Sequence, residues 1–144
     1  MKRLVIIFAG LALVASLAAG GFAATTKAPK RATIMIRHQV RGCHAWSVNG
    51  SAYRATLSTS LARGGAITFM NMDVMPHKLV KSSGPAIHLV GKPTMNHMSA
   101  TVKVTFSKPG VYKLTTKAGE DYPNMGEMKT VGEDNVLRLT VRVS

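Results

Sequence analysis

Several side chains of this sequence are of the types that bind soft and borderline metal ions. They are Cys43, His44, His77, His97 and Met98. Thiolate, imidazole and thioether groups are the ligands that such ions prefer in proteins. The imidazole of His77 follows Pro76 and opens a strand-like run, so the direction of its ring nitrogens would be fixed by the fold. We therefore predict that these side chains hold a metal ion.

The pair Cys43 and His44 needs a particular backbone to serve one ion. Consecutive residues of a strand point to opposite faces, so the two ligate together only if Gly42 produces a bulge or a loop. An unpaired cysteine can instead be a buried apolar residue, and this alternative stays open. Asp73, four residues before His77, either orients that imidazole or forms a turn. We interpret His38 and His88 as structural.

Short alternating runs must position these residues. Residues 31–38, 101–106 and 136–143 alternate apolar and polar side chains and are bounded by turn residues. No long segment keeps a helical period. Seven or eight such strands at spacings of about ten residues predict an all-β, antiparallel sandwich or barrel. Trp46 is expected in its core, whereas residues 94–98 are expected to form a polar loop that contains sulfur.

Two motifs resemble those of the cupredoxin family. Gly65-Ala-Ile-Thr-Phe-x-Asn-x-Asp-x-x-x-His77 is followed after about thirty residues by Phe106-x-x-Pro-Gly-x-Tyr112, in an order similar to the order of that family. The resemblance covers most of residues 31–144. It implies a cupredoxin-like Greek-key β-sandwich that holds a single copper ion at one end, and a role in electron transfer or copper carriage rather than enzymatic catalysis.

The second half of the family's ligand set is absent. In cupredoxins the strand after Pro-Gly-x-Tyr leads to a cysteine and then to a histidine, but here Thr116 stands at about the cysteine position and residues 117–128 contain no histidine. Only His77 carries over directly, with Met125 or Met128 as possible methionines. We expect Cys43 to supply the thiolate instead, at the ligand position where Thr116 replaces the family's cysteine. A copper(I) carrier that uses His97 and methionines is an alternative.

The N-terminal residues predict export. A basic start and an apolar run from Leu4 to Leu17 precede small residues, the pattern of a secretory signal peptide. We assign residues 1–24 to this signal, 25–30 to a linker and 31–144 to one domain. The expected location is periplasmic or extracellular, and the alternative is a retained N-terminal anchor.

The charge of the chain is strongly positive and uneven. The formal net charge is +13, and Asp73 is the only acid between residues 25 and 119. Such a body favours an acidic redox partner protein or an anionic envelope surface. Nucleic acid is disfavoured, because the chain is expected to be exported and has no recognition motif. No small-molecule substrate is evident. The rival hypothesis is a metal-free sandwich that binds envelope components through its basic surface.

Overall fold

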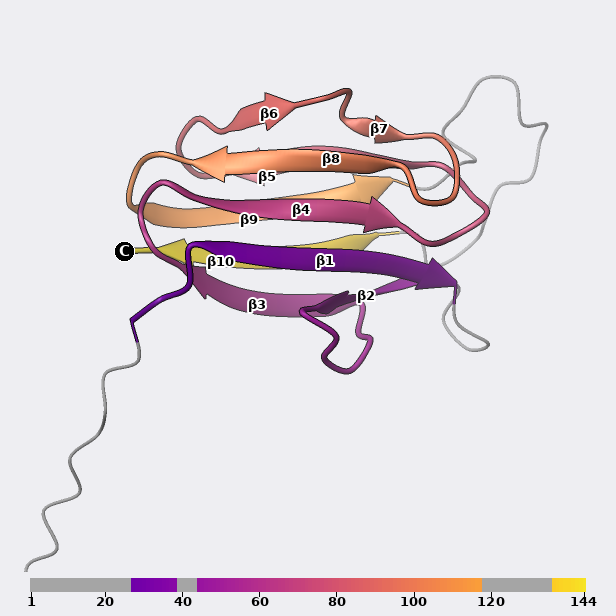
Figure 1. Ribbon diagram of the computed structural model, residues 1–144, viewed down its shortest axis with the longest axis horizontal. Helices are drawn as coiled ribbons and strands as arrows, with labels where there is room; N and C mark the ends of the chain where they lie inside the picture. Colours follow the sequence, from indigo (N-terminus) through magenta and orange to yellow (C-terminus); the bar gives the residue numbers. More distant parts are fainter. Residues whose placement is uncertain (1–26, 39–43, 118–135) are drawn as a thin grey trace, which may run out of the picture.

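The computed structural model describes residues 27–38, 44–117 and 136–144, which form two β-sheets packed face to face (Figure 1). The first sheet has the strand order β2 (His44–Val48), β1 (Arg31–His38), β4 (Gly65–Asn71), β8 (Thr101–Phe106) and β6 (His88–Val90). The second has the order β3 (Thr56–Leu61), β10 (Leu137–Val143), β9 (Gly110–Lys117), β5 (His77–Ser83) and β7 (Thr94–Met95). The predicted all-β sandwich is confirmed.

Two details differ from the predicted antiparallel arrangement of seven or eight strands. The pairs β1–β4 and β3–β10 are parallel, because after β2 the chain crosses to the other sheet and returns beside β1 in the same direction. The described residues contain ten strands, and the additional ones are short. Strand β7 lies in the segment expected to be a polar loop, and its Met95 is fully buried. That loop prediction was wrong for Met95, because its side chain enters the core.

The core lies between the sheets and is built from the alternating residues that face inward. Trp46 is fully buried, as predicted, and its ring centroid lies 6.4 Å from that of Phe69. The Phe-x-x-Pro-Gly-x-Tyr motif closes the opposite side of the core. Phe106 and Tyr112 pack edge to face at 4.9 Å, and the Tyr112 hydroxyl donates to the carbonyl of Lys108 at 2.6 Å. Gly110 has φ of 143°, which a residue with a side chain rarely adopts.

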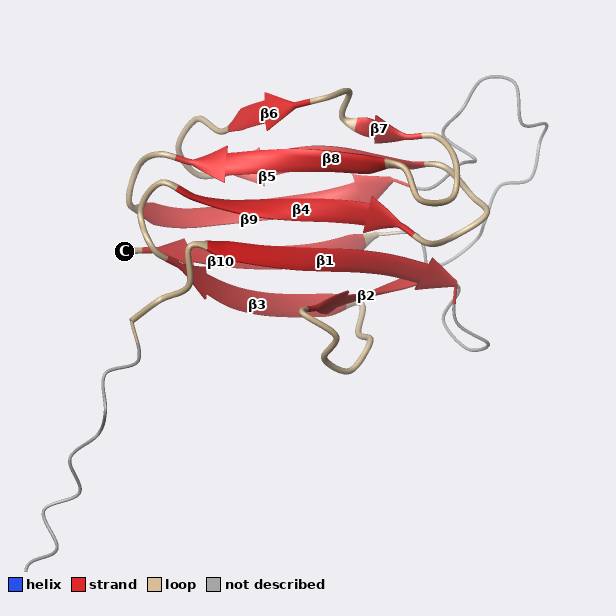
Figure 2. Cartoon of the chain, viewed as in Figure 1, coloured by secondary structure: helices blue, strands red, loops and turns tan. Residues whose placement is uncertain are grey.

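Strand ends at one end of the sandwich bring the chemically interesting residues together. Strands β1, β4, β7 and β9 end there, and β2, β5, β8 and β10 begin there (Figure 2). We call this the ligand end. The predicted signal peptide, residues 1–24, lies outside the described residues, as do residues 25 and 26 of the predicted linker. Within the described ranges, no helix has the length and apolar character needed to cross a membrane.

Candidate metal site

The turn between β4 and β5 is fixed by the side chain of Asn71. This side chain is fully buried, and its Nδ2 donates to the carbonyls of Met75 at 2.8 Å and Met95 at 3.2 Å. Its Oδ1 accepts from the Asp73 amide at 2.9 Å. A buried amide needs partners of this kind, and here they join the turn to β7. The Asn-x-Asp spacing therefore sets the position of Asp73.

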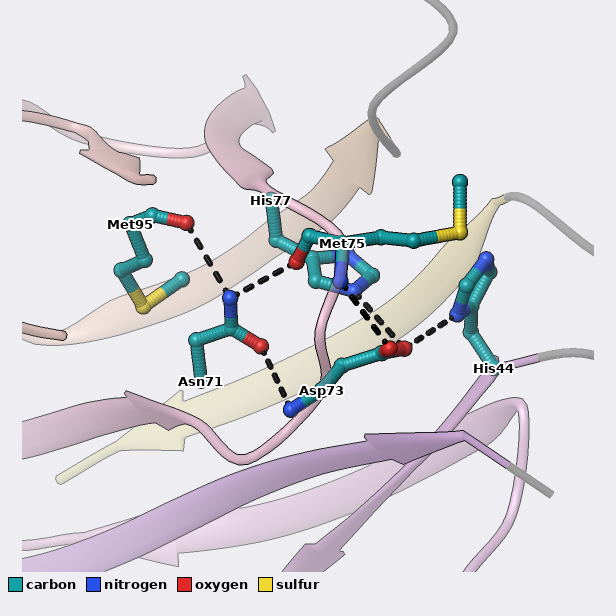
Figure 3. Close-up of polar contacts among 6 residues, drawn as sticks. All are labelled: His44, Asn71, Asp73, Met75, His77 and Met95. Atoms are coloured by element: carbon teal, nitrogen blue, oxygen red, sulfur yellow. Dashed lines mark hydrogen bonds and ion pairs between the residues drawn. The ribbon is translucent and has the colours of Figure 1, made fainter. Parts of the chain in front are cut away.

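Asp73 lies between two buried histidines (Figure 3). Its Oδ2 is 2.7 Å from Nδ1 of His44 and 3.3 Å from Nε2 of His77. His44 belongs to β2 of one sheet and His77 to β5 of the other, so the carboxylate bridges the two layers. The two imidazole rings are 4.8 Å apart and nearly perpendicular. All three residues are almost fully shielded from solvent.

Asp73 is the only acidic side chain within the described ranges of a chain that carries a net charge of +13. Burial raises the pKa of Asp73, but hydrogen bonds from the Met75 amide, His44 and His77, together with an electrostatic contribution from His44, outweigh burial and leave the pKa below its usual value. The carboxylate is therefore ionised at neutral pH and acts as an acceptor. Burying a charge without such partners would be costly.

The depressed pKa predicts a loss of stability in acid. Asp73 binds its proton more weakly in the folded protein, so its contribution is complete above the unfolded pKa of about 4 and is lost as the pH falls from there through the lower folded value. We expect the free energy of unfolding, measured with urea, to fall from pH 5 to pH 3. The Asp73→Asn variant should show a smaller fall. An equal fall in both proteins would contradict this assignment.

The contacts of Asp73 also fix the tautomers of the two histidines. Because an ionised carboxylate only accepts, Nδ1 of His44 and Nε2 of His77 carry the hydrogens that face it. In the neutral form of His44, Nε2 then carries the lone pair, and in the neutral form of His77, Nδ1 does. Carboxylates that orient imidazoles in this way are common behind metal ligands. The predicted orienting role of Asp73 toward His77 agrees with this geometry and extends to His44.

His38 also belongs to this group, although the sequence suggested only a structural role for it. It stands opposite His44 in the β1–β2 register, and the two rings are 5.8 Å apart. One ligand atom from each of His38, His44 and Asp73 lies within 4.8 Å of the others. The sequence could have indicated this position of His38, because residues equally distant from a β-hairpin turn face each other across the two strands.

Two further predicted ligands, His97 and Met98, lie at the same end of the sandwich but in an exposed loop. The loop joins β7 to β8 at the ligand end. This loop is held to the site through its backbone, since the Ser99 amide donates to the carbonyl of Asn71 at 2.6 Å. Nδ1 of His97 donates to the carbonyl of Met98 at 2.8 Å. No described contact joins either side chain to His44 or His77, so their ligation stays a prediction.

Three other sulfur ligands proposed from the sequence fall outside the described residues. Cys43 directly precedes β2, and Met125 and Met128 lie in the segment that joins β9 to β10. Both segments connect to strand ends at the ligand end. Their roles as ligands therefore stay predictions.

Thr116 occupies the inward face of β9 close to the site. It is fully buried, and it stands opposite Leu79 of β5 in the register, two positions along β5 from His77. Such diagonal neighbours on one face lie within reach of each other's side chains. Within the described part of the chain, its hydroxyl has no hydrogen-bond partner. The position expected for a thiolate therefore faces the site but carries a hydroxyl.

The candidate ligands within the described ranges are two buried imidazoles, one carboxylate and a third, exposed imidazole. Nitrogen and oxygen donors in this combination suit copper(II) and zinc. In the view of Figure 3 the Met75 side chain extends from the turn in the direction of His44. The donor set therefore fits a borderline transition metal without any contribution from the residues outside the described ranges.

Comparison with known proteins finds similarity only to solved structures, at low sequence identity. No protein-family model matches the chain, and no curated protein does. A purple cupredoxin from Nitrosopumilus maritimus is 24% identical, with a TM-score of 0.47 over 78% of this chain and 99% of that one. A reduced amicyanin variant is 16% identical, with a TM-score of 0.41 over 78% and 82%. A cysteine protease inhibitor from Entamoeba histolytica is 8% identical, with a TM-score of 0.43 over 81% and 99%. The described strands form a β-sandwich of two five-stranded sheets.

Proposed function

We propose that this chain binds one copper ion at the ligand end of the sandwich and serves in copper carriage or electron transfer. The observation that carries the proposal is the meeting of two buried imidazoles, His44 and His77, from opposite sheets at 4.8 Å. Nothing in the packing of an apolar core requires two histidines and an aspartate there. Several buried, ionisable side chains in contact with one another are typical of a binding or catalytic site, because burying them contributes little to stability.

His44 and His77 would hold the ion, and Cys43 is the proposed thiolate. Oδ2 of Asp73 contacts Nδ1 of His44 and Nε2 of His77, which orients both rings beside the ion. The Asn71 contacts hold Asp73 in place, and the strands fix both rings. Copper supplies one-electron redox chemistry when bound. Ligands held rigidly between two sheets would not rearrange when the ion changes its charge.

The setting of this role is also a proposal. We infer export from residues 1–24, and with it a periplasmic or extracellular location. The excess of lysine and arginine between residues 25 and 119 would favour an acidic redox partner protein or an anionic envelope surface. Long-range attraction of this kind weakens with salt. Complex formation with such a partner should therefore weaken as the salt concentration rises.

Copper titration of the purified protein tests the proposal. We expect one copper ion per chain at micromolar concentrations, with a strong visible absorption from the thiolate. Cys43→Ser should abolish the absorption but retain a copper ion on the histidines. His88→Gln is the control, because it also removes one histidine, but an exposed one on β6. It should change neither the copper stoichiometry nor the visible absorption. Absence of copper binding to the wild-type protein would contradict the proposal.

A groove on the outer face of the second sheet favours the rival function, a metal-free module that binds an anionic envelope polymer. Its volume is about 360 Å³, and its polar lining residues come from β3, β5, β9 and β10: Thr56, Ser82, Lys113, Thr115, Arg138 and Thr140. Two cations among hydroxyl groups suit phosphate or carboxylate groups. Binding to a polyanion without copper binding, lost on Lys113→Ala, would favour this rival.

A further inference from the structure

We propose that His38, His44 and Asp73 form a binding site for a divalent cation that needs no thiolate. The inference goes beyond the proposed copper function, because its ligand set is different and the cation need not be copper. One ligand atom from each of the three residues lies within 4.8 Å of the others. Two imidazoles and one carboxylate are a complete set of protein ligands for a metal site that keeps a further position for water or an exchanging ligand.

The three residues come from three separate parts of the chain. His38 ends β1, His44 begins β2, and Asp73 lies in the turn after β4. His38 and His44 are directly paired across the hairpin, and their rings meet edge to face. The Asn71 side chain holds Asp73 against His44. Two of the three ligands are therefore fixed before an ion arrives, which lowers the entropic cost of binding.

The third ligand can close on the ion. Ligand atoms around one zinc or copper ion are separated by about 3 to 4 Å, because each lies about 2.0–2.2 Å from the metal. The present separations of up to 4.8 Å therefore need a small rotation of a side chain. His38 is exposed at the end of its strand, so this rotation meets little resistance from packing.

His77 acts as a positioning residue for this cation. Its Nε2 contacts the same oxygen, Oδ2 of Asp73, that His44 contacts. When the ion replaces the hydrogen between His44 and Asp73, the contact from His77 still orients the carboxylate. The cation then lies toward the exposed His38 rather than toward the buried His77. An ion held on this side has a direct route to solvent, which suits a protein that takes up or delivers a metal.

Titration with zinc(II) and cobalt(II) tests this site independently of redox chemistry. The measurements use the Cys43→Ser protein, so that the only thiol contributes nothing. We expect one ion per chain, and we expect His38→Gln to weaken binding by at least about 100-fold, since even residues behind metal ligands contribute 10- to 100-fold. His88→Gln, the matched exposed histidine of β6, should bind like its parent. Circular dichroism and the melting temperature check that each variant is folded.

The possible failures are distinguishable. Equal zinc(II) affinity in the His38→Gln and parent proteins would overturn the assignment of His38, and absence of any divalent binding would overturn the site. If zinc(II) binds and is lost with His38, while the wild-type protein binds no copper, the cation site stands and the proposed copper function fails. If copper binds with a thiolate colour and zinc(II) does not bind the Cys43→Ser protein, the copper function stands and this inference fails.

Discussion

Replacing Asp73 with alanine is expected to lower the free energy of unfolding by about 3 to 5 kcal/mol, the cost of removing one partner from a buried charged group. The carboxylate accepts from His44, His77 and the Met75 amide, and each hydrogen bond to a charged group contributes about 1.5–3 kcal/mol. Alanine leaves all three donors buried without this acceptor. Because the same carboxylate orients both imidazoles, copper affinity should fall by about 10- to 100-fold as well.

Urea unfolding of the metal-free proteins at pH 7 measures the stability change. Asp73→Asn is the matched variant, because its amide oxygen can still accept from Met75 and its shape is unchanged. We expect it to lose stability, but less than Asp73→Ala. A stability of Asp73→Ala within about 1 kcal/mol of wild type would mean that the buried contacts contribute little, and the proposed organisation of the site would be wrong.

Two successive substitutions move the thiol from position 43 to position 116. In the copper-loaded protein, the first is expected to remove the visible absorption and the second to restore it. Cys43→Ser should be colourless. Adding Thr116→Cys should bring the absorption back, because Thr116 is fully buried and faces the site from β9. Threonine and cysteine are similar in size, so the core should accept the change with a small loss of stability. The new thiolate would lie diagonally from His77 across the two strands.

Thr115→Cys in the Cys43→Ser protein is the control. Thr115 is the neighbouring residue of the same type, and successive residues of a strand point to opposite faces, so its thiol would lie on the outer face of the second sheet, away from the proposed ion. Visible spectra of the three copper-loaded proteins are compared at equal copper occupancy. Colour in the Thr115→Cys protein, or none in the Thr116→Cys protein, would show that position 116 does not face the ion.

The sequence predicted the fold well because its signals are local. Alternating runs and turn residues determine strands such as β1 and β8, and the Phe106–Tyr112 motif has a direct physical reason in the Tyr112–Lys108 hydrogen bond. The parallel pairs could not be predicted in this way. They depend on which sheet each strand joins, and this is decided by packing across the whole domain. Met95 was misplaced for the same reason, since a two-residue strand carries no periodic signal.

The site was predicted in part. Pro76 before His77 and the Asn-x-Asp spacing indicated a fixed imidazole, and in the structure the ring of His44 lies 4.8 Å from that of His77. The central position of Asp73 was one of two open interpretations, because a turn aspartate and an orienting carboxylate look alike in sequence. His38 was missed because its role depends on the register of β1 and β2. The proposed ligation by Cys43, His97 and Met98 awaits experiment.

X-ray absorption spectroscopy of the copper-loaded protein tests the central claim most directly, because it identifies the atoms bound to the metal. The account predicts one copper per chain with at least two imidazole nitrogens at about 2.0 Å, the usual length of such bonds. His44→Ala and His77→Ala should each remove imidazole scattering, whereas His88→Gln should not. Copper bound without imidazole, or with the same imidazole signal after both substitutions, would contradict the assignment of the site.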